Sequence, residues 1–431
     1  MVERKVFLAF FGFAVGDTGT EVGDTLFGAA GNRFAAGLMF GAASGFALAV
    51  LPGDLGAQVV RQVLQDTKVD PAAIDEVIFA NQHSAGQGPS LARRVQREAG
   101  IPDEIPATTV NMQCGSGMKA IIFGCNAIQA GADIILAGGV ECMSEVPYIL
   151  TNTVRKGVKM GPSSVKVEDS LYCDGLIDQF YGFLMGETAE RVADLEHVTR
   201  EEQDAFALRS QTLAAQAIDS GRFRDEIVPI HYFDRKKQEH VFDTDESITR
   251  GTTLESLQKL KPAFRKENGT VTAGNACQLN DGAAAVLLCS EDAVKKYGFT
   301  PIAEIVSTAV VGIDPAIMGL GPVKTVIKAL DMVGMKMQDV ELMELNEAFA
   351  AQSLGCIRQW ARHYGITEQE IIDKTNVNGG GIALGHPVAA TGTRVTVTLM
   401  NELKKRGLRY GVATMCVGGG MGAAAVIKMC D

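Results

Sequence analysis

The sequence predicts an α/β protein made of two similar halves, and three observations support this prediction. The chain of 431 residues is 46% hydrophobic and contains 48 glycines, as expected of a packed α/β protein with many tight turns. A helix-like segment followed by an apolar run occurs twice, in residues 54–85 and 322–352. A longer pattern also occurs twice, in residues 107–139 and 374–420. Two packed α/β halves account for both repeats.

The repeats predict the elements of each half in order. In the first half, an amphipathic helix over 54–70 leads into a strand-like apolar run over 76–85. In the second half, a helix over 322–339 leads into a similar run over 340–352. The longer repeat then adds a strand, a Gly-rich turn, a long helix and a strand that ends in glycines to each half.

The region between the repeats has a different composition. Residues 147–279 are more polar and include a charged helix-like stretch over 199–223. We therefore predict a loop domain over 147–279, inserted into a first half that occupies residues 1–146 and resumes over 280–301. The second half is assigned to residues 302–431.

The charge and the cysteines exclude several classes of protein. The formal net charge of −11 argues against non-specific nucleic-acid binding, although a local cluster of Lys and Arg could still bind an anion. The nine cysteines are odd in number, show no CxxC spacing and accompany no secretory signal of the usual form. We therefore expect a reducing, cytoplasmic location, mostly buried thiols and no metal site.

The first 53 residues do not fit the repeat pattern. Residues 34–53 form a run of 20 residues without a formal charge, with three glycines spaced four apart. Such a run is long enough to span a bilayer, and this glycine spacing is typical of paired membrane helices. The run is also rich in Gly and Ala and is closed by Pro52 and Asp54. We favour a buried or irregular loop over a membrane role.

Cys114 is a candidate nucleophile. It follows an apolar run and precedes a helical pattern, where free backbone N–H groups would stabilise a thiolate. Gly115 and Gly117 beside it would let a ligand approach the sulfur closely. A cysteine alone at such a position is more often a small core residue, so the flanking glycines and the turn decide in favour of the nucleophile.

Three residues of the second half are candidate partners of Cys114. His386 occupies the matching Gly-rich turn, where an imidazole could deprotonate a thiol or donate to an oxyanion. Cys416 opens a Gly-rich turn whose N–H groups could hold an oxyanion; a phosphate loop is the weaker reading, because the Walker lysine is missing. Asn346 could orient a water or cap a helix.

These motifs resemble the signatures of the thiolase family, in their order along the chain. The four main ones are CGSG at 114–117, NEAFAAQ at 346–352, GHP at 385–387 and CVGGGMG at 416–422. The supporting ones are GETAE at 186–190, DEIVPI at 225–230, KPAF at 261–264 and TAGNACQLNDGAAAV at 272–286. The resemblance covers residues 54–431 and is strongest to the biosynthetic thiolases. It implies a five-layer αβαβα core with an inserted loop domain.

The resemblance implies a ping-pong Claisen condensation of two acetyl-CoA molecules to acetoacetyl-CoA. Cys114, activated by His386, would accept the acyl group, and Cys416 would exchange the α-proton of the second acetyl-CoA. The enolate oxygen would be held by His386 and by a water on Asn346. The thioester oxygen would be held by backbone N–H groups of Cys114 and Gly418. These donors would meet each charge as it develops.

The resemblance further implies CoA thioesters as substrates, with no permanently bound cofactor and no metal. The residues expected to contact CoA are Met185, Ser256, Leu260, Phe264, Ala273, Gly274, Phe349 and, less directly aligned, Arg250. A homodimer or homotetramer and a role in fatty acid metabolism are expected, and residues 154–161 resemble a tetramer-forming loop. No nucleic-acid partner is expected.

Four departures from the family pattern bear on these expectations. The first 53 residues lack the usual arginine turn and contain about twenty extra residues. Ala389 replaces a glycine, and it would strain the loop of His386 if the position needs a positive φ. Cys277 replaces a serine that contacts pantetheine, and Leu184 replaces a histidine. The last two changes would loosen CoA binding or admit a longer acyl chain.

Two alternatives therefore stay open. One is a degradative 3-ketoacyl-CoA thiolase for longer chains. The other is a non-catalytic, thiolase-like acyl-binding protein, which Ala389 and the atypical first 53 residues favour and the intact candidate residues oppose. A decarboxylating ketoacyl synthase fits less well, because that class uses two histidines and lacks the second cysteine.

Overall fold

The computed structural model describes residues 4–17, 50–150, 154–155, 157–158, 165–234 and 236–430, with the backbone alone for 9–17. Most of the charge-free run over 34–53 and half of the predicted tetramer loop over 154–161 lie outside these residues. Within the described part, no helix is long and apolar enough to cross a membrane.

Within the described ranges, nine strands form one continuous sheet in the order β11-β12-β13-β10-β1-β9-β4-β2-β3. Those of the first half are β1 (Val6–Asp17), β2 (Glu76–Ala80), β3 (Ala107–Val110), β4 (Ile134–Cys142) and β9 (Asn280–Ser290). Those of the second half are β10 (Ala303–Gly312), β11 (Leu342–Leu345), β12 (Tyr410–Val417) and β13 (Met421–Met429). The halves join where β1 pairs antiparallel with β10. Phe7 lies opposite Glu304, and Leu8 lies opposite Ala303.

The strand pairings repeat between the halves. In the first half β2 is parallel to β4, β4 is antiparallel to β9, and β9 is antiparallel to β1. In the second half β11 is parallel to β12, β12 is antiparallel to β13, and β13 is antiparallel to β10. The counterpart of β3 is reduced to a single parallel bridge between Met343 and Thr375. The predicted duplication is thus a structural one.

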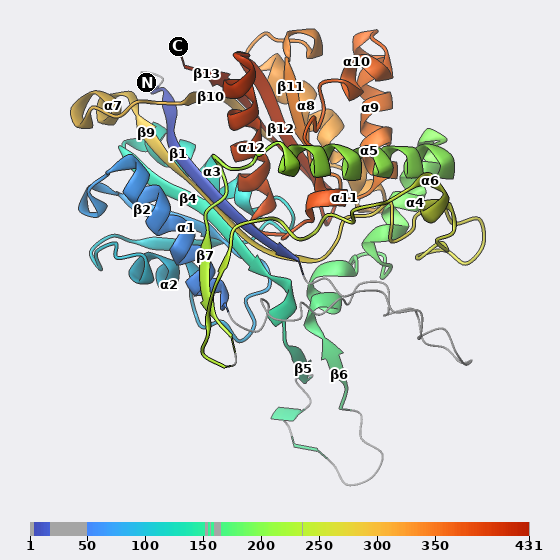
Figure 1. Cartoon of the computed structure of the whole chain (residues 1–431), viewed down its shortest axis with the longest axis horizontal. Coiled ribbons are helices and arrows are strands. Elements are labelled where there is room, and N and C mark those ends of the chain that lie inside the picture. Colours follow the sequence, from blue (N-terminus) through green and yellow to red (C-terminus); the bar gives the residue numbers. More distant parts are fainter. Residues whose placement is uncertain are drawn as a thin grey trace.

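The helices and the two halves of the sheet form five layers, which three hydrophobic cores hold together. Helices α1 (Pro52–Thr67) and α2 (Leu91–Glu98) pack on the outer face of the first half. Helices α3 (Ser116–Ala130) and α12 (Thr391–Arg406) share the central core between the halves. Helices α8 (Gly321–Asp331) and α9 (Ala350–Tyr364) cover the outer face of the second half. Figure 1 shows this order, which confirms the expected αβαβα arrangement.

The described part of the segment between β4 and β9 contains three α-helices and two hairpins. The helices are α4 (Met185–Glu196), α5 (Arg200–Asp219) and α6 (Leu254–Gln258). The hairpins are β5 (Tyr148–Leu150) with β6 (Val167–Asp169) and β7 (Ile230–Phe233) with β8 (Glu239–Phe242). The long charged helix α5 begins at a capping box formed by Thr199 and Glu202. It packs against α9 and α11 (Gly381–Leu384) of the second half.

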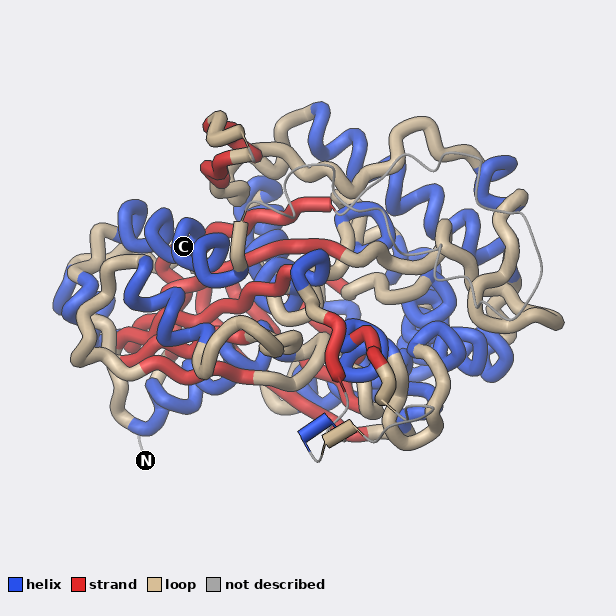
Figure 2. The backbone as a smooth tube through the Cα atoms, turned by 90° about the horizontal axis from the view of Figure 1, so that it is seen from below, coloured by secondary structure: helices blue, strands red, loops and turns tan. Residues whose placement is uncertain are grey.

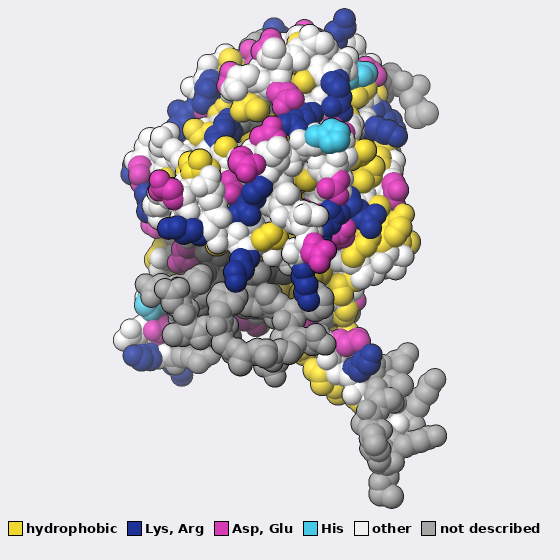
Figure 3. Space-filling model, turned by 90° about the vertical axis from the view of Figure 1, so that its right-hand side faces the viewer, with side chains coloured by type: hydrophobic (Ala, Val, Ile, Leu, Met, Phe, Trp, Pro, Cys, Tyr) yellow, Lys and Arg dark blue, Asp and Glu magenta, His cyan; other side chains and the backbone are white. Residues whose placement is uncertain are grey.

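The remaining helices are short. Helices α7 (Glu291–Tyr297) and α10 (Glu368–Ile372) each contain less than two turns. Among the described residues, further 3₁₀ segments lie at Pro71–Ala73, Met143–Glu145, Pro315–Leu320 and Met337–Asp339, and a π-helical segment lies at Tyr172–Leu176. Figure 2 shows how helices and loops enclose the strands. On the face in Figure 3, Lys and Arg side chains lie among Asp and Glu, so this face is not uniformly acidic.

The topology places the functional loops at one edge of the sheet. Strands β2, β3 and β4 run parallel, so their carboxyl ends lie side by side. The same holds for β11 and β12 in the second half. Because the carboxyl ends of parallel strands are where ligands bind in α/β sheets, the loops that follow these strands are the natural place for a site.

Candidate active site

Cys114 lies in a tight turn between β3 and α3. The N–H of Gly115 donates to the carbonyl of Met112 at 3.1 Å, and the N–H of Ser116 donates to the carbonyl of Gln113 at 2.9 Å. The Ser116 hydroxyl donates to the same Gln113 carbonyl at 2.6 Å. Gln113 has a φ of 48°, in the left-handed region that is uncommon for residues other than glycine. Strain of this kind persists where the surroundings hold the backbone firmly, as at active sites.

The groups around the Cys114 thiol have opposing effects on its acidity. Burial raises the pKa of the thiol, whereas hydrogen bonds from the backbone N–H groups of Gly418 and of Cys114 itself lower it. The nearby Glu141 carboxylate raises the pKa further. Burial dominates, so the thiol is protonated at neutral pH and needs a base to become a nucleophile.

The turn after β12 can contact Cys114 only because it consists of glycines. A Cβ atom on Gly418 would lie 1.8 Å from Oε1 of Gln113, so any side chain there would displace the Gln113 side chain. The next two residues, Gly419 and Gly420, have φ angles of 76° and 80°, which favour glycine for conformational reasons. The bare backbone allows the Gly418 N–H to reach the Cys114 sulfur.

His386 is buried and held in one tautomer. Its Nδ1 lies 2.6 Å from the hydroxyl oxygen of Thr391, and that hydroxyl donates its proton to the carbonyl of Pro387 at 3.0 Å. Thr391 therefore accepts from Nδ1–H, and Nε2 carries the lone pair. Nε2 has no hydrogen-bond partner within the described part of the chain. Burial, helped by the charge of Arg394, lowers the pKa of His386 to about 3, so the ring is a neutral base.

Ala389 does not strain the loop that carries His386. Its φ is not positive, so the condition under which alanine would be unfavourable is not met. Its N–H donates to Oε2 of Glu141 at 3.2 Å, and its side chain is buried in the central core. The substitution of glycine by alanine is therefore compatible with the local backbone.

Cys416 is a buried thiol close to three others. It lies one residue before the end of β12, opposite Gly422 of β13. Burial raises the pKa of its thiol well above the ordinary value, and the neighbouring Cys114, Cys356 and Cys277 raise it further. Cys416 therefore rests as a neutral thiol that can exchange a proton with a strong partner.

Asn346 carries a free amide in a buried position. It directly follows β11, and its backbone N–H donates to the carbonyl of Thr414 at 3.0 Å. Its side chain is fully buried, and neither amide atom has a hydrogen-bond partner among the described residues. Because buried polar groups nearly always have partners, this amide is suited to hold a substrate atom or a water.

One cavity brings four of the predicted site residues together. Cys114, His386, Met185 and Phe349 line a cavity of about 60 Å³. The other residues that line it are Gln82, His83, Gln113, Met143, Gly175, Leu176, Cys277, Gln278, Leu279, Met318, Ala348 and Val388. Asn346 and Cys416 are fully buried and do not line the cavity itself.

The other residues expected to contact CoA lie on or near the inserted segment. Phe264 packs edge-on against Phe349 of the cavity, with ring centroids 6.1 Å apart. Gly274 and Leu260 are neighbours, since a Cβ on Gly274 would lie 2.6 Å from Cδ1 of Leu260. Ala273 precedes Gly274 and is partly exposed.

Two further residues that were expected to contact CoA have side chains that already bind other residues of this chain. The Ser256 hydroxyl belongs to the capping box of α6 with Thr253. Arg250 is exposed and forms an ion pair with Asp219 at 2.8 Å.

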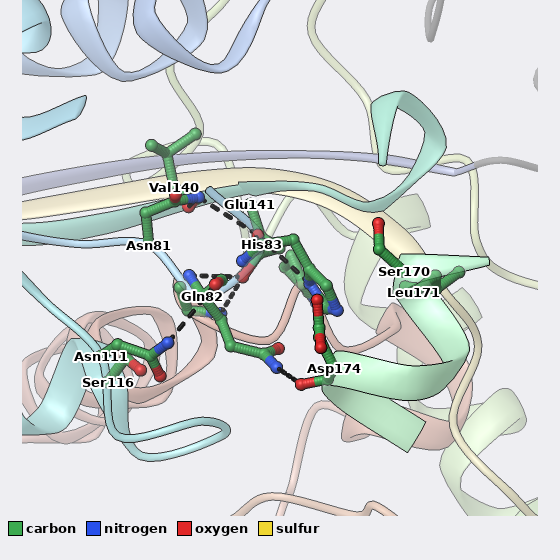
Figure 4. A network of polar contacts seen from close by, with 12 residues as sticks. Asn81, Gln82, His83, Asn111, Ser116, Val140, Glu141, Ser170, Leu171 and Asp174 are labelled. Carbon is green, nitrogen blue, oxygen red and sulfur yellow. Dashed lines mark hydrogen bonds and ion pairs between the residues drawn. The ribbon is translucent and has the colours of Figure 1, made fainter. Parts of the chain in front are cut away.

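Sequence reasoning missed a polar cluster at the end of β2. Glu141, near the end of β4, accepts hydrogen bonds from the backbone N–H groups of Gln82 and His83 at 3.1 Å. It also accepts from Nδ2 of Asn81 at 3.2 Å, and its Oε1 lies 3.5 Å from Nδ1 of His83 (Figure 4). The sequence did contain a signal for this cluster. Polar residues directly follow β2, and the matching position after β11 in the second half is the candidate site residue Asn346.

Comparison with known proteins identifies related families. The model described as "Thiolase, N-terminal domain" matches residues 35–292, and "Thiolase, C-terminal domain" matches residues 299–429. The acetyl-CoA acetyltransferase of Pseudomonas aeruginosa is 49% identical over 382 residues, which are 88% of this chain and 94% of that protein. The enzyme of the same name from Syntrophomonas wolfei is 48% identical over 87% of this chain and 92% of its own length.

Solved structures agree with these relatives. The Bacillus anthracis acetyl-CoA acetyltransferase superposes with a TM-score of 0.87 at 39% identity and covers 99% of both chains. Human mitochondrial 3-ketoacyl-CoA thiolase superposes with a TM-score of 0.87 at 41% identity and covers 100% of both chains. The same human protein is also known in complex with CoA, at a TM-score of 0.85, with 100% of this chain and 99% of that chain covered.

Proposed function

Because the chain belongs to the thiolase family, and is therefore an acyltransferase, we propose that it condenses two acetyl-CoA molecules to acetoacetyl-CoA and CoA, reversibly. The observation that carries this proposal is the arrangement around Cys114. The sulfur is contacted by two backbone N–H groups and shares a cavity with the free Nε2 of His386. A nucleophile, a base and an oxyanion site are the parts that acyl transfer requires.

In the first half-reaction, His386 would take the proton of Cys114 as the sulfur attacks the thioester carbonyl. The neutral imidazole, with Nδ1–H donated to Thr391, presents the basic Nε2 that this step needs. The developing oxyanion would be held by the N–H groups of Cys114 and Gly418. Because this site is built from fixed backbone groups, it needs no rearrangement when the charge appears. The C–S bond to CoA would then break, and the leaving CoA sulfur would take the proton of Cys416, which leaves Cys416 as a thiolate.

In the second half-reaction, the Cys416 thiolate would remove the α-proton of the incoming acetyl-CoA, and its raised pKa makes it a strong base for this step. The enolate oxygen would be held by the protonated Nε2 of His386 and by a water on the free amide of Asn346. The carbanion would then attack the acyl group on Cys114, forming the carbon–carbon bond and releasing the Cys114 thiolate. This thiolate would take back the proton from His386, which restores the resting site.

The pantetheine arm of CoA would pass Met185 and Phe349, which line the same cavity as Cys114. Phe264, Leu260, Ala273, Gly274 and Ser256 form the adjoining surface of the inserted segment, and Arg250 is a further candidate for a phosphate. CoA would be a substrate and not a permanently bound cofactor.

A second candidate is the thiolysis of longer 3-ketoacyl-CoA. The identity of 41% to a human 3-ketoacyl-CoA thiolase favours it, as does Leu184, which makes its surroundings less polar than a histidine would. The assigned domain bounds, a homodimer or homotetramer, the cytoplasm and a role in fatty acid metabolism remain predictions.

A thiolysis assay tests this proposal. The wild-type chain should cleave acetoacetyl-CoA in the presence of CoA, and the Cys114→Ala variant should not. A Cys125→Ala variant is the matched control, because Cys125 is a buried thiol of α3 that does not line the cavity. Absence of cleavage by the wild type with acetoacetyl-CoA and with a longer substrate would refute the enzymatic proposal.

A further inference from the structure

The cavity around Cys114 contains two polar side chains that the proposed reaction does not use. His83 and Gln82, which we call the polar pair, line this cavity. Their exposed fractions are 4% and 8%, so both are buried. Nε2 of His83 and Oε1 of Gln82 have no hydrogen-bond partner among the described residues. Two buried polar atoms left open at one cavity indicate that a ligand supplies their partners.

The neighbouring contacts show that both open atoms are acceptors. Nε2 of Gln82 donates to the carbonyl of Asp174 at 2.9 Å, which fixes the amide and leaves its oxygen free. Nδ1 of His83 lies 3.5 Å from Oε1 of Glu141, so the ring proton is favoured at Nδ1, facing the carboxylate. With the ring proton at Nδ1, Nε2 of His83 presents a lone pair. The polar pair therefore favours a ligand group that donates hydrogen bonds.

The charges around the cavity exclude an anionic partner. Its lining contains no Lys or Arg within the described part of the chain. The Glu141 carboxylate lies directly behind His83 (Figure 4). A carboxylate on the ligand would meet two acceptors and a like charge, which is unfavourable in a buried site.

Gly175 keeps the His83 nitrogen accessible. It lies on the π-helical segment Tyr172–Leu176 and lines the same cavity. A Cβ atom on Gly175 would lie 2.5 Å from Nε2 of His83, so any side chain there would cover this nitrogen. The absence of a side chain thus opens the polar pair to the cavity.

We propose that the polar pair recognises acyl chains that carry an uncharged or cationic hydrogen-bond donor, a hydroxyl or an amino group, beyond the thioester. This inference rests on the proposed thiolase reaction and names a substrate class for its acyl group. The donor contacts Nε2 of His83 and Oε1 of Gln82 while the thioester carbon lies at Cys114. An unsubstituted chain leaves both acceptors without partners, and a site built around a hydrogen bond discriminates strongly against such an analogue.

Four 3-ketoacyl-CoA substrates of equal chain length, ending in methyl, hydroxyl, ammonium or carboxylate, test the proposal. At least one donor-bearing substrate should exceed the methyl substrate in kcat/KM by about tenfold or more, and the carboxylate should be the poorest. A preference for methyl or carboxylate over both donors would overturn the proposal. Acetoacetyl-CoA cleavage is measured in parallel, so loss of the proposed function itself is distinguishable.

Two variants connect the preference to the polar pair. His83→Leu should reduce the donor-to-methyl ratio of kcat/KM to within about twofold, because one acceptor is removed. Gly175→Ala should reduce the same ratio by covering Nε2 while the imidazole stays in place. His231→Leu, at an exposed histidine of β7, is the control and should keep the wild-type ratio. Each ratio compares two substrates on the same variant, so a general loss of activity lowers both kcat/KM values and leaves the ratio unchanged. An unchanged ratio in both test variants would refute the role of the polar pair.

Discussion

At the residue scale, burial keeps the reacting groups neutral until substrate arrives. Burial raises the pKa values of the Cys114 and Cys416 thiols and lowers that of His386 to about 3. The resting site therefore carries no charge on these three groups at neutral pH. Charge appears only as the thioester reacts, where fixed backbone N–H groups can stabilise it more strongly than water could.

The Gly418→Ala substitution tests the backbone part of this site. A Cβ atom at residue 418 would lie 1.8 Å from Oε1 of Gln113, so the turn or the strained Gln113 must shift. We expect acetoacetyl-CoA thiolysis to fall by about 10²-fold or more, the usual effect of losing one oxyanion donor.

Gly312→Ala is the matched control for this substitution. Gly312 lies at the end of β10, and the nearest atom to an added Cβ is 3.9 Å away. The control should keep near-wild-type activity. If Gly418→Ala also did so, the Gly418 N–H would have no role in catalysis.

At the element scale, the start of α12 sets the state of His386. Thr391 is the first residue of this helix, and its hydroxyl connects the imidazole to the Pro387 carbonyl. The helix also packs against α3, which begins just after Cys114. The two helices of the central layer thus hold the nucleophile and its base in one rigid unit.

Thr391→Val tests this positioning role. The variant keeps the branched shape but leaves Nδ1–H of His386 without its acceptor in a buried site. We expect kcat for thiolysis to fall by about tenfold, with a much smaller change in KM. Thr391→Ser restores the hydroxyl and should recover most of the activity. A Thr391→Val variant with wild-type kcat, or a serine variant without recovery, would contradict this role.

Most elements could be predicted from local sequence patterns, but their ends depend on turns. The helix expected over 322–339 ends at Asp331, because Gly334 has a φ of 67° and only a 3₁₀ turn follows. The apolar run over 340–352 divides into the short strand β11 and the start of α9. Periodicity reports which face of a segment is buried and says less about where the backbone turns.

The site could be predicted only where it depends on local motifs. Cys114 and His386 lie in Gly-rich turns that are visible in the sequence, and the structure brings both to one cavity. The approach of His83 to Glu141 is not visible, because it joins β2 to β4 across 58 residues. Likewise, the hydrogen bond from the Ala389 N–H to Glu141 joins the two halves and is not visible in the sequence.

At the scale of the whole molecule, duplication brings one turn from each half to a common interface. Cys114 of the first half and His386 of the second lie in matching turns that precede the two central helices, α3 and α12. The inserted segment then packs across this layer through Glu226, which accepts a hydrogen bond from Nδ2 of Asn401 in α12 at 2.8 Å. Stability and site geometry therefore depend on the same interface.

Glu226 predicts a dependence of stability on pH. Burial raises its pKa to about 7, above the ordinary value of 4.5. Between these two pH values the folded state binds more protons at this group than the unfolded state, so its contribution to stability falls as pH rises. Glu226→Gln removes this dependence, and its unfolding midpoint should decrease less than that of the wild type between pH 5 and about pH 8.

The exposed Glu255 of α6 provides the control for this measurement. Thermal or urea unfolding of Glu255→Gln should show the wild-type dependence on pH. If the Glu226→Gln curve were parallel to the wild-type curve throughout this range, Glu226 would not be protonated in the folded state.

The central claim is that Cys114 accepts the acyl group, and mass spectrometry of the acyl-enzyme tests it most directly. After incubation with acetyl-CoA and rapid acid quenching, peptide mapping should find one acetyl group, on Cys114, and none in the Cys114→Ala variant. Addition of CoA before quenching should remove it, because the transfer is reversible. Acetylation of Cys277 or Cys416 in place of Cys114, or no CoA-reversible acetylation at all, would contradict the account.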